Sequence, residues 1–272
     1  MKKWTVLLTN DDGVNAPGLM ALKLELDKVA DVHVYAPDRN WSAAGRTMTF
    51  HKPLRVDRVR LLDGAVAYAC SGTPSDCVSL ALLGLIEHRP DLVVSGINAG
   101  LNVGQDITYS GTVAGAMEGA RGGVPAVALS QDIRSGEGSQ SDYAHAAYFA
   151  ARLVSRLLEQ SSLPPGVLLN VNVPVSPGGS GRALPVRVTK LGGHAYDNYL
   201  VVGKDPRGRN YYWITGDPLT EVSREEEDTD LGAVANGCIS ITPVHLDMTE
   251  KSLLAPLQKL ETTAWFDEPA TP

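Results

Sequence analysis

Short apolar runs alternate with segments of helical periodicity over the first 175 residues. The runs predict buried strands at residues 4–9, 31–37, 91–95, 125–130 and 167–173. Apolar positions at helical spacing predict helices at residues 17–29, 74–87, 111–123 and 142–160. Residues 54–62 and 66–70 predict two further strands around a turn. Because parallel strands need a helix to return the chain between them, this order predicts an α/β fold with a doubly wound, mostly parallel sheet.

The pattern changes near residue 176, where a run of Pro, Gly and Ser at 177–181 predicts a flexible break. An acidic stretch at 221–230 is interpreted as a solvated face or loop. Strand-like pieces and a closing helix are expected at residues 186–191, 210–214, 238–242 and 251–262. These pieces cannot easily form a core of their own. We therefore expect a sheet domain at 1–175, and at 176–272 hairpins that protrude from it and are ordered by a second copy of the chain.

Composition and charge narrow the class of protein. Hydrophobic residues make up 43% and charged residues 20% of the chain, which excludes a disordered protein. The formal net charge of -7 argues against binding to a nucleic-acid backbone or duplex. Cys70, Cys77 and Cys238 are too few and too uneven for a disulfide framework. With no apolar stretch long enough for a membrane span and no signal-peptide pattern, we expect a soluble cytoplasmic protein.

Two adjacent carboxylates, Asp11 and Asp12, follow the first predicted strand. Like charges this close repel each other unless a cation or a proton stabilises them. Their oxygens suit Mg²⁺, Mn²⁺ or Ca²⁺. Pro17 suits the first turn of the next helix, so one aspartate is equally well explained as the N-cap of that helix, and two less easily.

Weaker signals lie in two other loops. Residues 37–46 include Ser42, whose hydroxyl can ligate a metal, and arginines that can meet an anion, but a solvated loop explains them better. Ser71-Gly72-Thr73 precedes a proline and is good helix-capping chemistry. Cys77 lies in an apolar run and is expected in the core.

The most informative stretch is 95–112. A Gly-rich loop after a strand lets the backbone approach a ligand, and Asn98 offers a neutral oxygen. Ser110, Gly111 and Thr112 then open a helix of small residues, whose free N–H groups and dipole favour an anion. The alternative is an irregular loop with an ordinary helix cap. All these patches fall at the carboxyl ends of predicted strands, where a divalent metal beside an oxyanion pocket suits phosphoryl chemistry.

These motifs resemble the SurE family of stationary-phase survival proteins, metal-dependent phosphatases of nucleoside monophosphates. The matching residues cover about the first 130 positions in the order of the family. They are Thr9-Asn10-Asp11-Asp12-Gly13 with Ala16-Pro17-Gly18, Ala36-Pro37 with Ser42, residues 71–78, Ser95-Gly96-Ile97-Asn98-Ala99-Gly100 with Asn102, and Tyr109-Ser110-Gly111-Thr112-Val113. The resemblance implies a Rossmann-like catalytic core and a C-terminal region that exchanges hairpins between subunits of a homodimer or homotetramer.

The resemblance also implies a site. One divalent ion per subunit, Mg²⁺, Mn²⁺ or Ca²⁺, would be ligated by Asp11, Asp12, Ser42 and Asn98. The substrate phosphate would be held by Asn98, Ser110, Gly111 and Thr112. Many members have glycine directly after the ligand serine, whereas this chain has Ala43-Ala44-Gly45, which can alter the loop and the fit of the substrate.

The expected reaction is hydrolysis of nucleoside 5′- and 3′-monophosphates by metal-activated water, with a side activity on short polyphosphate. Asp11 or Asp12 can accept a proton in this reaction. The general acid is left open among His51, His145 and His194. Packing and base stacking are both open for Trp41, Tyr109 and Tyr196.

Two other interpretations are open. Asp11 can act as a nucleophile that forms an aspartyl phosphate, although phosphatases of that kind usually space their two aspartates by one residue. The second interpretation is a non-catalytic module that binds a metal or a nucleotide without turnover. A signalling receiver domain also has an acidic pair after its first strand, but the strand ends here lack its acceptor aspartate and its lysine.

Overall fold

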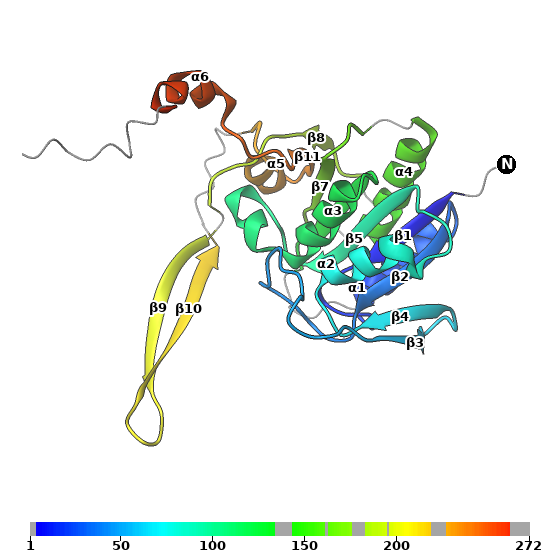
Figure 1. The fold of residues 1–272 in the computed structure, drawn as a ribbon, viewed down its shortest axis with the longest axis horizontal. Coiled ribbons are helices and arrows are strands. Elements are labelled where there is room, and N and C mark those ends of the chain that lie inside the picture. The colour runs from blue at the N-terminus through cyan, green and yellow to red at the C-terminus, as the bar shows by residue number, and fades with distance from the viewer. Residues whose placement is uncertain are drawn as a thin grey trace, which may run out of the picture.

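The computed structural model describes residues 4–133, 143–160, 163–175, 183–194, 196–218 and 227–261. Its centre is a nine-stranded sheet in the order β3-β4-β2-β1-β5-β6-β7-β11-β8 (Figure 1). The strands are β1 Thr5–Thr9, β2 Asp31–Pro37, β3 Val56–Arg60, β4 Val66–Cys70, β5 Leu92–Ala99, β6 Ala126–Gln131, β7 Val167–Val173, β8 Val186–Val188 and β11 Ile239–His245. The six strands from β4 to β7 are parallel, whereas β3 and β11 run antiparallel to β4 and β7. The predicted mostly parallel, doubly wound sheet is confirmed.

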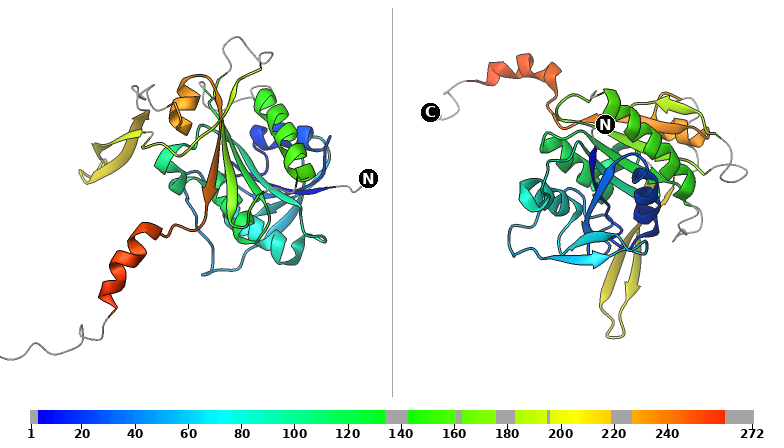
Figure 2. Two further views of the ribbon diagram at one scale, coloured as in Figure 1. Left: turned by 90° about the horizontal axis from the view of Figure 1, so that it is seen from above. Right: turned by 90° about the vertical axis from the view of Figure 1, so that its right-hand side faces the viewer.

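Helices cover both faces of the sheet (Figure 2). Alternation along β1 makes this possible, because Val6 and Leu8 point into one core and Leu7 into the other. One core packs under α1 and α4, and the other under α2 and α3. The helices are α1 Pro17–Leu26, α2 Pro74–Leu80, α3 Gly111–Arg121, α4 Ala144–Gln160, α5 Asp230–Ala235 and α6 Leu254–Leu257. Within the described residues, no helix combines the length and the hydropathy of a membrane span.

The helix predicted at 74–87 is shorter than its apolar pattern suggests. Regular α-helix ends at Leu80, and a π-helical turn, η1, continues over Ala81–Leu85. Gly84 has a φ of 130°, which is incompatible with a helix. The start of the helix is as expected, because Thr73 and Asp76 form a reciprocal capping box. Cys77 is buried, as predicted.

The region after residue 176 differs from its prediction in three places. Strands β8 and β11 extend the central sheet, whereas β9 Tyr196–Lys204, which the pattern did not predict, pairs with β10 Asn210–Pro218 in a protruding hairpin (Figures 1 and 2). The closing helix is broken into the 3₁₀ turn η4 Lys251–Leu253, α6 and the 3₁₀ turn η5 Gln258–Leu260. The solvated assignment is wrong for Asp230, which is fully buried. The break at 177–181 and residues 221–226 lie outside the described part, and the division at 175/176 stays a prediction.

Small residues let α3 lie close to the sheet. A Cβ added at Gly119 would lie 2.7 Å from the Cβ of Val93, and one at Gly115 would lie 2.8 Å from Ser95 Oγ. Both distances are below van der Waals contact. The helix therefore approaches β5 closely, as its composition predicts, and this brings its N-terminus to the carboxyl end of the sheet.

Replacing Gly119 by Ala is expected to destabilise the fold, although alanine favours a helix more than glycine does. The clash with Val93 forces α3 away from β5, at a cost of about 1–3 kcal/mol. Urea unfolding measures the change. Gly193→Ala is the control, because an added Cβ there has no atom within 4 Å. Equal stability of the Gly119→Ala variant and the wild type would contradict the close packing.

Candidate active site

The two aspartates sit in a tight turn at the end of β1. Asn10 braces this turn, accepting from Gly13 N at 3.2 Å and donating to Gly13 O at 3.0 Å. Helix α1 begins after Ala16, and no side chain caps it. The alternative in which Asp11 or Asp12 caps this helix is therefore wrong.

Asp11 faces the N-terminus of α3. Thr112 Oγ1 donates a hydrogen bond to Asp11 Oδ1, across 101 residues of sequence. At Gly111, an added Cβ would lie 2.7 Å from the Cβ of Asp11, so a side chain there would push the two elements apart. The sequence predicted that Asp11, Gly111 and Thr112 belong to one site, and the structure brings them into contact.

Burial controls the protonation of both carboxyl groups. It raises the pKa of Asp11 to about 6; the Thr112 hydrogen bond opposes this rise and the charge of Asp12 adds to it. Burial also raises the pKa of Asp12, against a hydrogen bond from the Ala99 N–H. In the described part of the chain, no Lys or Arg forms an ion pair with either aspartate. The end of β1 thus holds negative charge without a protein cation.

The loop after β2 carries Ser42 to this pair. Trp41 N donates to the backbone oxygen of Asp11 at 2.7 Å. Asn40 links the two sides, because its Nδ2 lies 3.4 Å from Asp12 Oδ1 and its Oδ1 accepts from Ser42 N at 2.6 Å. Asn40 was not predicted from the sequence as a site residue. Its only signal there was its position midway between Asp38 and Ser42. Ala43 has a φ of 57°, a backbone conformation that favours glycine. Many family members have glycine at this position, so alanine here adopts a strained backbone conformation.

Asn98 reaches the site from β5. Its Nδ2 donates to Gly100 O at 2.9 Å, and its Oδ1 has no hydrogen-bond partner within the described residues. The next residue, Ala99, contacts the Asp12 carboxylate through its N–H. Asn98 is half-buried. It lies next in sequence to the residue that contacts Asp12, and its amide oxygen is available for a ligand.

Ser110 is buried and begins α3 as its N-cap, accepting from Val113 N at 3.1 Å. The backbone N–H of Gly111 precedes the first helical hydrogen bonds and has no partner within the described residues, so it is free to meet an anion. The backbone N–H of Thr112 instead donates to the Asp11 carboxylate, which opposes the rise of the Asp11 pKa. Gly45 N donates to Tyr109 O at 2.9 Å, which joins the Ser42 loop to this end of the helix. The predicted helix cap is confirmed at Ser110, and the anion site at the same end of α3 stays a prediction.

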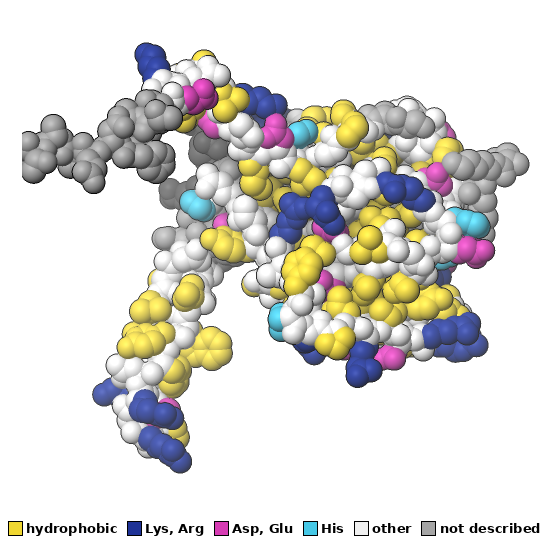
Figure 3. All heavy atoms as spheres, viewed as in Figure 1, with side chains coloured by type: hydrophobic (Ala, Val, Ile, Leu, Met, Phe, Trp, Pro, Cys, Tyr) yellow, Lys and Arg dark blue, Asp and Glu magenta, His cyan; other side chains and the backbone are white. Residues whose placement is uncertain are grey.

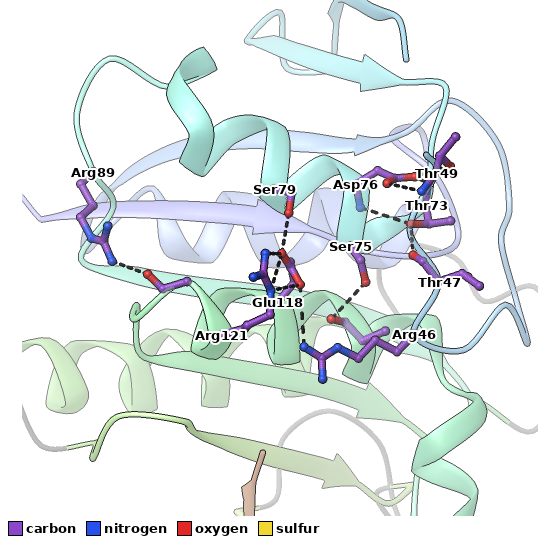
Figure 4. A network of polar contacts seen from close by, with 12 residues as sticks. Arg46, Thr47, Thr49, Thr73, Ser75, Asp76, Ser79, Arg89, Glu118 and Arg121 are labelled. Carbon is purple, nitrogen blue, oxygen red and sulfur yellow. Dashed lines mark hydrogen bonds and ion pairs between the residues drawn. The ribbon is translucent and has the colours of Figure 1, made fainter. Parts of the chain in front are cut away.

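An ion-pair network around the buried Glu118 lies between α2 and α3 (Figure 4). Glu118 is buried and pairs with Arg121, accepts from the hydroxyl of Ser79, and lies 3.9 Å from Arg46. Arg46 belongs to the Ser42 loop, so the network connects that loop, α2 and α3. The sequence left two interpretations for Arg46, contact with an anion or a solvated loop, and favoured the loop. In the structure Arg46 lies beside an anion of the protein itself, Glu118.

A cleft of about 510 Å³ opens beside the pair, lined by Asp12, Arg39, Asn40, Ala99 and Tyr143 among others. The Arg39 guanidinium lies 4.8 Å from the centre of the Trp41 ring. One face of the Trp41 ring is therefore covered by the Arg39 side chain. Of the three candidate histidines, His194 lies 3.6 Å from Asp106. Within the described residues, neither His51 nor His145 contacts the two carboxylates.

With metal removed by a chelator, Asp11→Asn is expected to stabilise the protein near neutral pH. The folded chain holds the Asp11 proton up to a pKa of about 6 and the unfolded chain only to 3.8, so the wild type loses stability as the pH rises through this window. Asparagine has no charge to desolvate, and the variant gains roughly 2–3 kcal/mol above this window.

Urea unfolding between about pH 4 and pH 8 measures this gain, which should shrink towards zero at the acid end. The exposed Asp57 supplies the control variant Asp57→Asn, for which we expect no such trend. A gain that does not change with pH would contradict the buried, uncompensated charge.

Comparison with known proteins agrees with this geometry. The family model "Survival protein SurE" matches residues 6–198. The chain is 48% identical to a protein of Herpetosiphon aurantiacus named 5'-nucleotidase SurE, over 96% of this chain and 98% of that one. It is 46% identical to the protein of the same name from Moorella thermoacetica, over 96% and 97%. The crystal structure of the Aquifex aeolicus SurE protein superposes with a TM-score of 0.81 at 38% identity, covering 95% of this chain and all of that one. The motifs, the fold and these relatives together establish that the chain belongs to the SurE family.

Proposed function

We propose that this protein is a metal-dependent phosphomonoesterase that hydrolyses nucleoside 5′- and 3′-monophosphates, with a side activity on short polyphosphate. The observation that carries the proposal is the contact of Asp11 with Thr112, which joins paired carboxylates to the N-terminus of α3. A metal site and an anion site side by side are what phosphoryl transfer needs. The relatives named 5'-nucleotidase SurE support the same activity.

The donor chemistry fits a hard divalent ion. Among the residues that the structure describes, no cation pairs with the carboxylate oxygens of Asp11 and Asp12, and the amide oxygen of Asn98 has no partner. With the hydroxyl of Ser42, these residues would hold one Mg²⁺, Mn²⁺ or Ca²⁺ per subunit. The ion supplies positive charge to the phosphate and lowers the pKa of a water molecule.

The protein groups then have separate roles. The N–H group of Gly111 binds a phosphate oxygen at the end of α3, between Ser110 and Thr112, and stabilises the charge that builds up during attack. Thr112 Oγ1 fixes the orientation of the Asp11 carboxylate. Asp11 or Asp12 takes a proton from the attacking water. The three free, buried cysteines support a cytoplasmic location, where thiols stay reduced.

Phosphate release from a panel of 5′- and 3′-nucleoside monophosphates, with Mn²⁺, with Mg²⁺ and with chelator, tests this function. We expect release that depends on metal and falls at least about 100-fold in both Asp11→Asn and Asp12→Asn. Asp57→Asn, on an exposed strand, should keep the wild-type rate. A folded wild type that binds Mn²⁺ but turns over no phosphomonoester would leave a binding role, and a trapped phosphoenzyme would instead make Asp11 a nucleophile.

We also propose that the hairpin of β9 and β10 holds subunits together in a homodimer or homotetramer. Large apolar side chains are exposed along this hairpin, and those on the face in view are seen in Figure 3. Because neighbouring residues of a strand point to opposite faces, the exposed residues lie on both faces of the hairpin. They are Tyr199, Leu200, Val201, Val202, Tyr211, Tyr212, Trp213 and Ile214. A two-stranded hairpin is marginally stable alone, and such a surface marks an interaction site. A second copy of the chain is the partner that covers it.

Replacing Trp213 and Ile214 together by Glu is expected to lower the mass of the assembly in analytical ultracentrifugation. The charges oppose burial of a surface on which these two side chains are 65% and 82% exposed. Leu62→Glu is the matched control, because Leu62 is 92% exposed on the turn between β3 and β4. An unchanged mass for the double variant would contradict a hairpin interface.

A further inference from the structure

Asp230 is a buried carboxylate far from the acidic pair. It opens α5, and its side chain is fully buried. Its Oδ2 accepts from Gly104 N at 2.8 Å, and its Oδ1 accepts from Gly192 N at 2.8 Å and from Leu231 N at 2.9 Å. Gly104 is 126 residues away in the sequence. A carboxylate is costly to bury, so three short backbone hydrogen bonds indicate a specific use.

Further contacts join the same two segments. Gln105 N donates to Gly193 O at 3.1 Å, and a Cβ added at Gly104 would lie 1.9 Å from that oxygen. His194 Nδ1 lies 3.6 Å from Asp106 Oδ1. We call residues 104–106, residues 192–194 and Asp230 together the clasp. It attaches a segment from the first half of the chain to two from the second.

The clasp lies on the path to the phosphate-binding end of α3. Gly104 begins the 3₁₀ helix η2, Gly104–Tyr109, which leads directly into Ser110. Two residues before Gly104, Asn102 is held by β7. Asn172 Oδ1 accepts from the Asn102 N–H, and Asn172 Nδ2 donates to the Asn102 carbonyl oxygen, both at 2.8 Å. The path from Asn98 to Thr112 is thus held at Asn102 by the sheet and at Gly104 by the clasp.

We infer that Asp230 is a positioning residue for the phosphate site, acting through Gly104 on the segment that presents Ser110, Gly111 and Thr112. The inference rests on the proposed function and adds a requirement to it. The second half of the chain sets the position of the groups that bind phosphate, although the contacts of the clasp do not reach them directly. The hairpin strand β9 starts at Tyr196, two residues after the end of the clasp at His194.

Asp230→Asn tests this role with the smallest change of shape. The amide of asparagine keeps one oxygen that can accept a hydrogen bond. Its NH₂ group replaces the other oxygen and cannot accept from a backbone N–H, so hydrogen bonding on one side of the side chain is lost. We expect the inhibition constant of inorganic phosphate and the KM for a nucleoside monophosphate to rise about tenfold, more than kcat falls. The midpoint of Mn²⁺ binding should stay within about twofold, because the four metal-site residues are not in the clasp.

The matched control is Asp228→Asn, in which the same substitution falls on a largely exposed carboxylate paired with Lys190. We expect wild-type constants for it. Hydrogen exchange of residues 104–109 adds a readout independent of turnover, and should be faster in Asp230→Asn only. A variant that is merely less stable, with the phosphate constant and the KM of the wild type, would overturn the inference.

Gly104→Ala disturbs the same clasp without changing Asp230. It tests whether the effect belongs to the clasp rather than to the Asp230 side chain alone. The added Cβ meets Gly193 O, so this variant should also weaken phosphate binding. Gly64→Ala is its control, since Gly64 also has a positive φ but faces open space. Loss of phosphate affinity in Gly64→Ala as well would contradict the inference. An inactive wild type would remove the proposed function itself, whereas an active wild type with unaffected clasp variants would remove only this inference.

Discussion

The architecture depends on holding the Asp11 carboxylate against the N-terminus of α3. Asp11 is buried beside a second carboxylate, and its pKa shows that the cost of this burial is only partly offset by Thr112. Three features keep the arrangement in place. Glycine at 111 leaves room for Asp11, glycines at 115 and 119 let α3 lie close to β5, and the network around Glu118 ties α3 to α2. A folded protein retains such a charge where a ligand uses it.

Sequence reasoning succeeded where local pattern and tertiary burial agree. The parallel strands are short apolar runs, and the carboxyl ends of such strands meet at one edge of a sheet. The pattern alone therefore placed Asp11, Asn98 and Thr112 near one another. Thr73 was also readable, because a capping box is a local motif. The metal-ligand role predicted for Ser42 rests on the resemblance, since a hydroxyl in a polar loop is explained better by a solvated loop when taken alone.

Other features could not be read because their causes are not local. The strand at Tyr196–Lys204 packs on no core within the described chain, so its exposed apolar side chains show no burial pattern. Asp230 was assigned to solvent because its neighbours are acidic, yet its partners are backbone N–H groups brought from positions 104 and 192 by the fold. The helix expected at 251–262 has apolar residues at helical spacing but no surface to pack on within the described chain, and it breaks into single turns.

The position of Asp230 in the chain has a consequence for biosynthesis. A ribosome emits the sheet strands β1 to β7, together with Asp11, Asn98 and Thr112, well before Asp230 and β11 leave the exit tunnel. Until then, Gly104 lacks its carboxylate partner and one edge of β7 lacks its neighbour. The growing chain therefore exposes the strand ends that carry Asp11 and Asn98 before the contacts that fix Gly104 and the outer edge of β7 can form. The last quarter of the sequence completes a fold whose central strands are made much earlier.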